Sequence, residues 1–198
     1  MNLPNKLTIT RIVLIPVFML FIIPLPKQWE TLAIIKEFNL FITQFGKYVA
    51  GLIFIIAAFT DALDGHIART RHIITNFGKF LDPIADKLLV SAALIALIQL
   101  DRLNGWFVFI ILAREFLVSG IRLVAACEGK VIAASRWGKL KMLSQTIAIL
   151  LIIFDNFPFS LFTDADIGGY FMVLAVIATV VSGYDYLKKN IEIIKIGN

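Results

Sequence analysis

The chain has 198 residues, of which 59% are hydrophobic and only 17% are charged, and its mean hydropathy is +0.86. Soluble domains carry about 25% charged residues, so this composition disfavours a water-soluble helical core. The net charge of +5 is compatible with nucleic-acid binding, but the basic residues lie between apolar runs, as they do in membrane proteins. We therefore expect an all-α integral membrane protein that forms a single domain over residues 1–198.

Six apolar runs approach the roughly 20 residues that a transmembrane helix needs. We expect the six helices at residues 8–24, 47–65, 83–100, 105–127, 137–155 and 167–186. The segments before the first helix, between the second and third, between the fourth and fifth, and after the sixth carry twelve Lys and Arg, against four in the alternate segments. By the positive-inside rule, both chain termini are expected to be cytoplasmic.

Residues 26–46 separate the first two expected helices without forming a span of their own. They mix Trp29, Leu32 and Phe45 with lysine and glutamate. That mixture is typical of an amphipathic helix lying in the interface on the outer face of the membrane, although an ordinary loop fits nearly as well.

Four carboxylates stand where an apolar chain would not place them without a function, because ionisable groups in a bilayer are costly. Asp61 and Asp64 lie three residues apart on one face of the second helix, and Asp82 and Asp86 lie four apart at the start of the third. Such carboxylates repel one another unless cations lie among them. Mg²⁺ or Mn²⁺ would take these oxygen ligands, and two such ions would form the clamp used in phosphoryl transfer. The sequence has no Cys/His cluster, which argues against structural zinc.

The neighbouring residues suit a phosphate-bearing ligand. Gly65 allows close approach to the backbone, Ala68 is small, and Arg69 offers a planar fork for phosphate. Simpler interpretations exist for single residues: Asp82 before Pro83 is a good helix start, with the aspartate as cap. Arg69 alone would be a positive-inside marker. The joint pattern is what favours a polar active-site cavity that faces the cytoplasm.

Residues 61–86 read Asp-x₂-Asp-Gly-x₂-Ala-Arg-x₈-Gly-x₃-Asp-x₃-Asp. The fixed positions are Asp61, Asp64, Gly65, Ala68, Arg69, Gly78, Asp82 and Asp86. At every position this pattern resembles the signature of the CDP-alcohol phosphatidyltransferases. Two further stretches, NLPNKLTITRIVLIPVF and residues 113–145, resemble the bacterial members of that family that use glycerol-3-phosphate.

The resemblance implies a reaction in which CDP-diacylglycerol donates a phosphatidyl group to glycerol-3-phosphate and CMP leaves. The implied metal ligands are Asp61, Asp64, Asp82 and Asp86. Asp86 is also the implied catalytic base for the acceptor hydroxyl. The implied CDP-diacylglycerol-binding residues are Asn5, Thr8, Asp61, Asp64, Gly65, Ala68, Arg69 and Gly78. The resemblance further implies a homodimer.

The acceptor carries a dianionic phosphate, so its site needs cations. Arg114, Arg122 and Lys139 are the expected glycerol-3-phosphate-binding residues. Arg114 is otherwise hard to justify at its depth in the membrane. Glu115 leaves an alternative open, because it can pair with a neighbouring cation and leave only one arginine for the phosphate.

Other functions remain as alternatives. Sibling enzymes use serine, inositol-phosphate or phosphatidylglycerol; serine needs fewer cations, whereas inositol-phosphate needs as many, and residues 113–145 favour glycerol-3-phosphate. Intramembrane prenyltransferases also hold Mg²⁺-diphosphate with aspartates but lack the Asp-Gly-x₂-Ala-Arg continuation. A cation transporter is a third class, but we see no repeat and no broken helix in the sequence.

Overall fold

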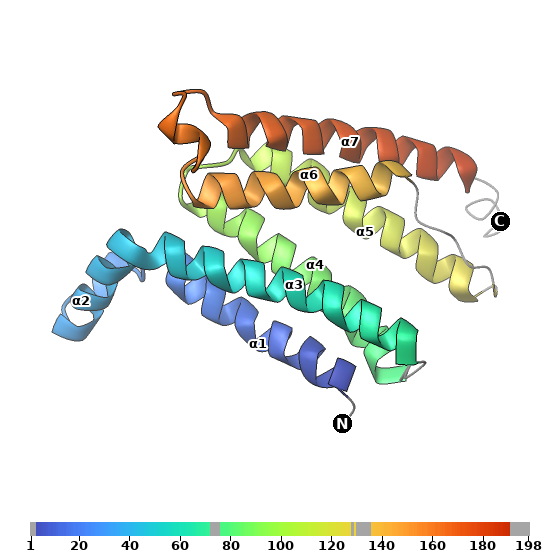
Figure 1. Ribbon diagram of the computed structural model, residues 1–198, viewed down its shortest axis with the longest axis horizontal. Helices are drawn as coiled ribbons and strands as arrows, with labels where there is room; N and C mark the ends of the chain where they lie inside the picture. The colour runs from blue at the N-terminus through green and yellow to red at the C-terminus, as the bar shows by residue number, and fades with distance from the viewer. Residues whose placement is uncertain (1–2, 72–75, 128, 130–135, 191–198) are drawn as a thin grey trace. The chain divides into compact units, whose positions relative to one another are not determined.

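The structure, a computed structural model, describes the backbone of residues 3–71, 76–127, 129 and 136–190. Side chains are described for residues 6–60, 81, 84–126, 129 and 137–190. Within these residues the fold is all-α, and its long helices are shown in Figure 1. They are α1 (Leu3–Ile22), α3 (Lys47–Arg71), α4 (Asn76–Gln99), α5 (Gly105–Cys127), α6 (Arg136–Ile153) and α7 (Ile167–Lys189). All six expected helices are thus confirmed as helices, and both ends of α5 are as expected.

The start of α4 differs from the expectation. The helix begins at Asn76, so Asp82 and Pro83 lie inside it rather than at its first turn. The interpretation of Asp82 as a helix cap is therefore wrong. Sequence reasoning placed the start at the proline because proline is favoured in a first turn. The residues before it, beginning at Asn76, are polar as well as apolar, a mixture that is as typical of a loop as of a helix.

The segment between α1 and α3 is helical rather than a loop. It contains a 3₁₀ turn (Lys27–Trp29), α2 (Ala33–Phe41) and a π-helical turn (Ile42–Gly46) that leads into α3. The buried Asn39 fixes its fold: the side-chain amide donates to Leu25 O (3.0 Å) and Glu30 Oε1 (2.8 Å).

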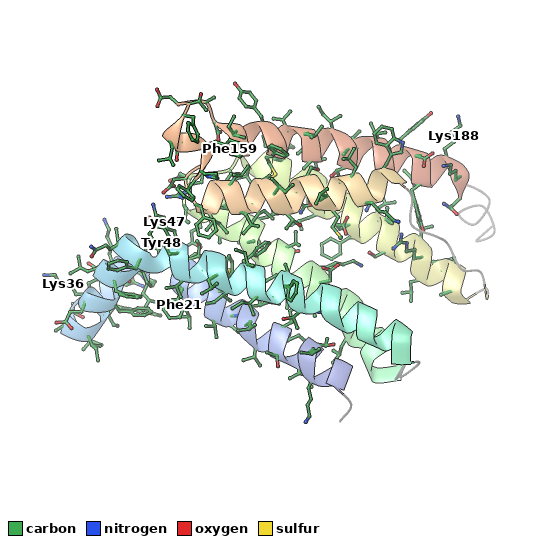
Figure 2. All side chains as sticks on the ribbon, in the orientation of Figure 1. Phe21, Lys36, Lys47, Tyr48, Phe159 and Lys188 are labelled. Carbon is green, nitrogen blue, oxygen red and sulfur yellow. The ribbon has the colours of Figure 1, made fainter. Side chains whose placement is uncertain are left out.

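Aromatic side chains join α2 to α1. The ring of Phe21, labelled in Figure 2, packs edge-on against Phe38 at 6.1 Å and Phe41 at 6.5 Å between ring centroids. The opposite side of this segment remains apolar and open, since Leu32 and Ile34 are 60% and 76% exposed. This segment therefore has one side packed against α1 and apolar side chains exposed elsewhere.

The chain divides into two compact units, residues 1–101 and 102–198. In the first unit, α1 packs against α3 and α4. The buried side of α1 repeats with alternating steps of three and four residues, the spacing of one helix face. This α1 stripe comprises Thr8, Arg11, Ile15, Phe18 and Ile22. Phe18 meets Phe54 of α3 at 6.0 Å between ring centroids.

In the second unit, α7 packs against both α5 and α6. Its buried side follows the same alternation of three- and four-residue steps. This α7 stripe comprises Gly168, Met172, Ala175, Thr179, Ser182 and Tyr186. The first residues are small or apolar, and the last two are polar. On α5 the buried Ile111, Val118 and Ala125 recur every seven residues.

Two helical stretches in the described part of the chain are long and apolar enough to cross a membrane by length and composition. They are Ala33–Thr60 and Ile167–Lys189, each with a mean hydropathy of 1.8. The first joins α2 to the apolar part of α3, and the second is α7. In α4, α5 and α6, ionisable residues interrupt the apolar sequence, and these include several of the predicted site residues.

Candidate active site

The four aspartates of the signature lie on two helices that contact each other in the first unit. Asp61 and Asp64 lie towards the carboxyl end of α3, and Asp82 and Asp86 lie in the amino-terminal half of α4. Figure 1 shows these helix ends at one end of the unit, together with the start of α1. The backbone therefore agrees with the predicted pairs at i, i+3 and i, i+4, and chain order brings both pairs towards the α3–α4 connection.

Much of the predicted donor site lies outside the described side chains. This holds for Asn5, Asp61, Asp64, Gly65, Ala68, Arg69, Gly78 and Asp82. Asp86 is described and is partly buried. Among the described residues there is no group of three or more His, Cys, Asp or Glu side chains that would hold a metal. The metal site stays a prediction, and its donor set of carboxylate oxygens suits a hard cation such as Mg²⁺.

Two polar residues of α1 are buried at the same end of the first unit. Thr8, a predicted donor-binding residue, and Arg11 are both 0% exposed and occupy the first positions of the α1 stripe. Charged side chains are almost never fully buried without a partner. Arg11 therefore brings a positive charge into the interior of the unit near the helix ends that carry the aspartates.

In the second unit, an ionic cluster joins α5, α6 and α7. The carboxylate Oε1 of Glu115 accepts from Arg114 Nη1 at 2.8 Å and from Lys141 Nζ at 2.6 Å. The second terminal nitrogen of Arg114, Nη2, donates to Ser182 Oγ at 2.5 Å. The side chains of Arg114 and Lys141 are only 15% and 7% exposed. The pairing raised for Glu115 is thus observed, since its carboxylate is shared by two neighbouring cations, while the number of arginines left for a phosphate stays a prediction.

The other two predicted acceptor residues are exposed. The Arg122 guanidinium carbon lies 5.6 Å from the centre of the Tyr186 ring, a cation–π distance. Lys139 lies near the start of α6, two residues before the buried Lys141. Figure 1 shows the end of α5, the start of α6 and the end of α7 at one end of this unit. The structure therefore gathers the helix ends that carry Arg122, Lys139 and Lys141.

Several buried polar residues of this unit were not predicted from the sequence, including Ser182, Tyr186 and Gln145. Ser182 is 0% exposed, Tyr186 3% and Gln145 2%. Neither amide atom of Gln145 has a hydrogen-bond partner within the described part of the chain. The polar ending of the α7 stripe is a signal that would have pointed to Ser182 and Tyr186. Nothing comparable marks Gln145 in the sequence.

A small cavity of about 280 Å³ lies at the opposite end of the second unit, lined by Arg102, by Ile152 of α6 and by residues of the α6–α7 connection. Its polar groups bond one another: Arg102 pairs with Asp155 at 2.7 Å and donates to Ile152 O at 3.1 Å. Asp166 caps α7 by accepting from Gly169 N at 2.9 Å. These contacts stabilise the α6–α7 connection. Among the described residues that line this cavity, the charged groups do not form a cluster of cations like that of the proposed acceptor site.

The comparisons with known proteins agree with the signature. The model of the CDP-alcohol phosphatidyltransferase family matches residues 1–181. The chain is 46% identical over 199 residues to the CDP-diacylglycerol–glycerol-3-phosphate 3-phosphatidyltransferase of Bacillus subtilis, covering 100% of this chain and 99% of that protein. It is 36% identical over 187 residues to the protein of the same name from Rickettsia typhi, covering 94% and 96%. It is 37% identical over 193 residues to a probable phosphatidylglycerophosphate synthase of Mycobacterium tuberculosis, covering 96% and 82%. The chain belongs to the CDP-alcohol phosphatidyltransferase family.

Proposed function

We propose that this chain transfers the phosphatidyl group of CDP-diacylglycerol to glycerol-3-phosphate, which gives phosphatidylglycerophosphate and CMP. The observation that carries the proposal is the full-length similarity to a relative named for this reaction, at 46% identity over 100% of the chain. The signature over residues 61–86 supports the same chemistry, and the cationic cluster of the second unit suits a phosphorylated acceptor.

In the proposed mechanism, Asp86 takes the proton from the acceptor hydroxyl, whose oxygen attacks the phosphorus next to the diacylglycerol. The bond from that phosphorus to the oxygen bridging to the cytidine phosphate breaks, and CMP leaves. A positioned carboxylate is a suitable base for such a proton transfer. Asp61, Asp64 and Asp82, with Asp86, would hold two Mg²⁺ or Mn²⁺ ions. When bound, these ions supply positive charge that offsets the charge of the leaving phosphate.

The proposed donor pocket follows the signature. Gly65, Ala68 and Gly78 leave room for the cytidine diphosphate, and Arg69 holds a phosphate. Asn5 and Thr8 reach the nucleotide from α1. Two observations support that assignment: Thr8 is buried, and the start of α1 lies at the same end of the unit as the carboxyl end of α3 and the start of α4.

The proposed acceptor site consists of Arg114, Arg122 and Lys139. Arginine forks bind phosphate with two parallel hydrogen bonds, which a lysine point charge cannot do. Glu115 shares Arg114 with the acceptor instead of removing it, because only Nη1 of the guanidinium meets the carboxylate. A serine acceptor carries no phosphate and would give these cations no partner.

The proposed setting is a bilayer, crossed six times, with both termini and the site on the cytoplasmic side. Large apolar side chains are exposed along α3, α5 and α7, where a soluble protein would present charge. Examples with more than half of their surface exposed are Leu52, Phe59, Phe109, Phe116, Leu123, Ile177 and Val180. Residues 26–46 would lie in the outer interface, and the working form would be a homodimer.

CMP release by the detergent-purified chain tests the proposal. The assay contains CDP-diacylglycerol and Mg²⁺, with glycerol-3-phosphate, serine or inositol-phosphate added singly and EDTA as control. We expect release only with glycerol-3-phosphate and none in EDTA. Release with another acceptor alone would keep the chemistry and refute the acceptor. If CMP is released with none of the acceptors, the proposed transferase activity is refuted and the alternative of a cation transporter is favoured.

A further inference from the structure

We propose that Ser182 and Tyr186 of α7 are positioning residues that hold Arg114 and Arg122 in place for the acceptor phosphate. The inference rests on the proposed function, because it concerns how the proposed acceptor site is built. Neither residue would touch the substrate. Each would act through an arginine of α5, and together they would make α7 a determinant of acceptor affinity.

The first support is the composition of the α7 stripe. Through Met172, Ala175 and Thr179 this buried face packs small and apolar groups against its neighbours, and the Thr179 hydroxyl donates to its own helix at Ala175 O (2.6 Å). The next buried positions, Ser182 and Tyr186, instead meet arginines of another helix. A buried hydroxyl needs a hydrogen-bond partner. The hydroxyl of Ser182 accepts from the Arg114 guanidinium, whereas that of Thr179 bonds to its own helix.

The second support is the geometry around Arg114. Its guanidinium is held from two sides, by Glu115 at 2.8 Å and by Ser182 at 2.5 Å. Next to Ser182, a Cβ added to Gly183 would lie 3.2 Å from the Cγ of Arg114. The stem of the arginine therefore passes close to α7 where the helix has no side chain. A guanidinium has five N–H donors, so the two contacts leave others, Nε–H among them, for an anion. Nε is buried and has no partner among the described side chains.

The third support is the contact between Arg122 and Tyr186. Arg122 is exposed, so its long side chain has many conformations to choose from unless a neighbour restricts it. The Tyr186 ring, 3% exposed, is a fixed surface 5.6 Å from the guanidinium carbon. The Tyr186 hydroxyl is buried and bonds to nothing in the described residues. The ring rather than the hydroxyl should therefore carry the effect.

The two contacts lie four residues apart on α7, about one turn, and eight apart on α5, about two turns, so both join the same pair of packed helices. A shift of α7 along α5 would move both arginines together. Precise placement matters because a bidentate phosphate contact requires both donors to be aligned.

Steady-state kinetics of the full-length protein, with CDP-diacylglycerol and glycerol-3-phosphate varied separately, tests the inference. S182A should raise KM for glycerol-3-phosphate about tenfold, the size expected for loss of a charge-assisted hydrogen bond. Y186L should raise it about threefold, as for an exposed cation–π contact. Neither variant should change KM for the lipid or kcat by more than about twofold.

Matched variants on the same helix separate positioning from damage. T179A also removes a fully buried hydroxyl, but one bonded to its own helix, and Y184L removes a tyrosine that is 69% exposed. Both should leave KM for glycerol-3-phosphate unchanged. Y186F, which keeps the ring, should restore most of the affinity lost in Y186L. If S182A does not fold, G183A provides the second measurement, because its added Cβ would lie 3.2 Å from Arg114 Cγ and crowd the stem of that arginine, which should raise the same KM.

The outcomes distinguish the inference from the proposed function. If the unaltered protein does not use glycerol-3-phosphate, the proposed acceptor is wrong. If the unaltered protein uses glycerol-3-phosphate but S182A and Y186L change kcat and both KM values alike, the positioning role is refuted. It is also refuted if T179A and Y184L raise KM for glycerol-3-phosphate as much as S182A and Y186L do. A rise confined to the acceptor KM, with rescue in Y186F, supports the inference.

Discussion

Each unit of the chain contains a helix whose buried stripe is apolar over most of its length and polar at one end. The predicted site residues near that end have opposite charges in the two units. In the first, the α1 stripe is apolar through Ile15, Phe18 and Ile22 and polar at Thr8 and Arg11. In the second, the α7 stripe is apolar early and polar at its end. In each unit the polar end of the stripe lies with the helix ends that carry predicted site residues, carboxylates in one and cations in the other.

The difference lies in how the charges are spread along the chain. The carboxylates stand within residues 61–86, so a local pattern identifies them. The ionic cluster of the second unit combines Glu115, Lys141 and Ser182, from three helices. A motif of closely spaced residues can be recognised in the sequence. A cluster whose residues come from three helices can be recognised only when the packing of those helices is known. Substitutions in the two units should therefore fail in different ways.

The largest effect is expected at the carboxylate end. D86N keeps the size of the side chain but cannot take a proton, so kcat should fall by about 10²- to 10⁴-fold. Binding of CDP-diacylglycerol, measured by equilibrium binding of a labelled lipid, should persist. The matched control is D185N, which alters a half-buried aspartate paired with Lys189 at 2.9 Å and should keep normal turnover. Normal turnover in D86N would remove Asp86 as the base.

A second, smaller effect is expected at the cationic end. R114A should raise KM for glycerol-3-phosphate about 10- to 100-fold, because charge-assisted bonds to the phosphate are lost. KM for the lipid should change little. R102A serves as the control, since that arginine pairs with Asp155 at the other end of the unit. Equal changes in both KM values would move Arg114 out of the acceptor site.

The Mg²⁺ concentration required for activity should distinguish substitutions in the first unit from those in the second. D61N removes a proposed ligand and should raise the Mg²⁺ concentration needed for half-maximal activity by about tenfold or more. R114A should leave that concentration unchanged, because its cation belongs to the acceptor site. Mg²⁺ titrations of CMP release, with glycerol-3-phosphate saturating for each variant, measure the difference. An equal shift in both variants would contradict the assignment of separate sites.

The smallest expected effect concerns stability. E115Q removes the negative charge that Arg114 and Lys141 share, while Glu115 itself is 22% exposed. We expect a loss of about 1–3 kcal/mol, below the cost of breaking a fully buried pair. A fall in the melting temperature in detergent would show it. E37Q, on the exposed surface of α2, should not change that temperature. An unchanged E115Q would mean that the cluster does not stabilise the second unit.

Much of the fold was predictable because long apolar runs impose helices, and α5 was placed with both ends correct. The start of α4 was missed because a proline preceded by aspartate imitates a helix start. The signature was found because its spacing is local. The buried spacing of α7 marks Ser182 and Tyr186 as polar positions, but their role was missed because their partners are arginines of α5, which only helix packing brings beside them.

The shared carboxylate of Glu115 has a consequence for turnover. In the proposed reaction the product keeps the phosphate by which the acceptor was held, so the cations that capture the acceptor also retain the product. Release of product often limits the rate of such an enzyme. Glu115 competes with the phosphate for Arg114 in both states, and it accepts from that arginine when no phosphate is bound. The carboxylate would thus weaken acceptor capture and also shorten the time that the finished lipid spends on the protein.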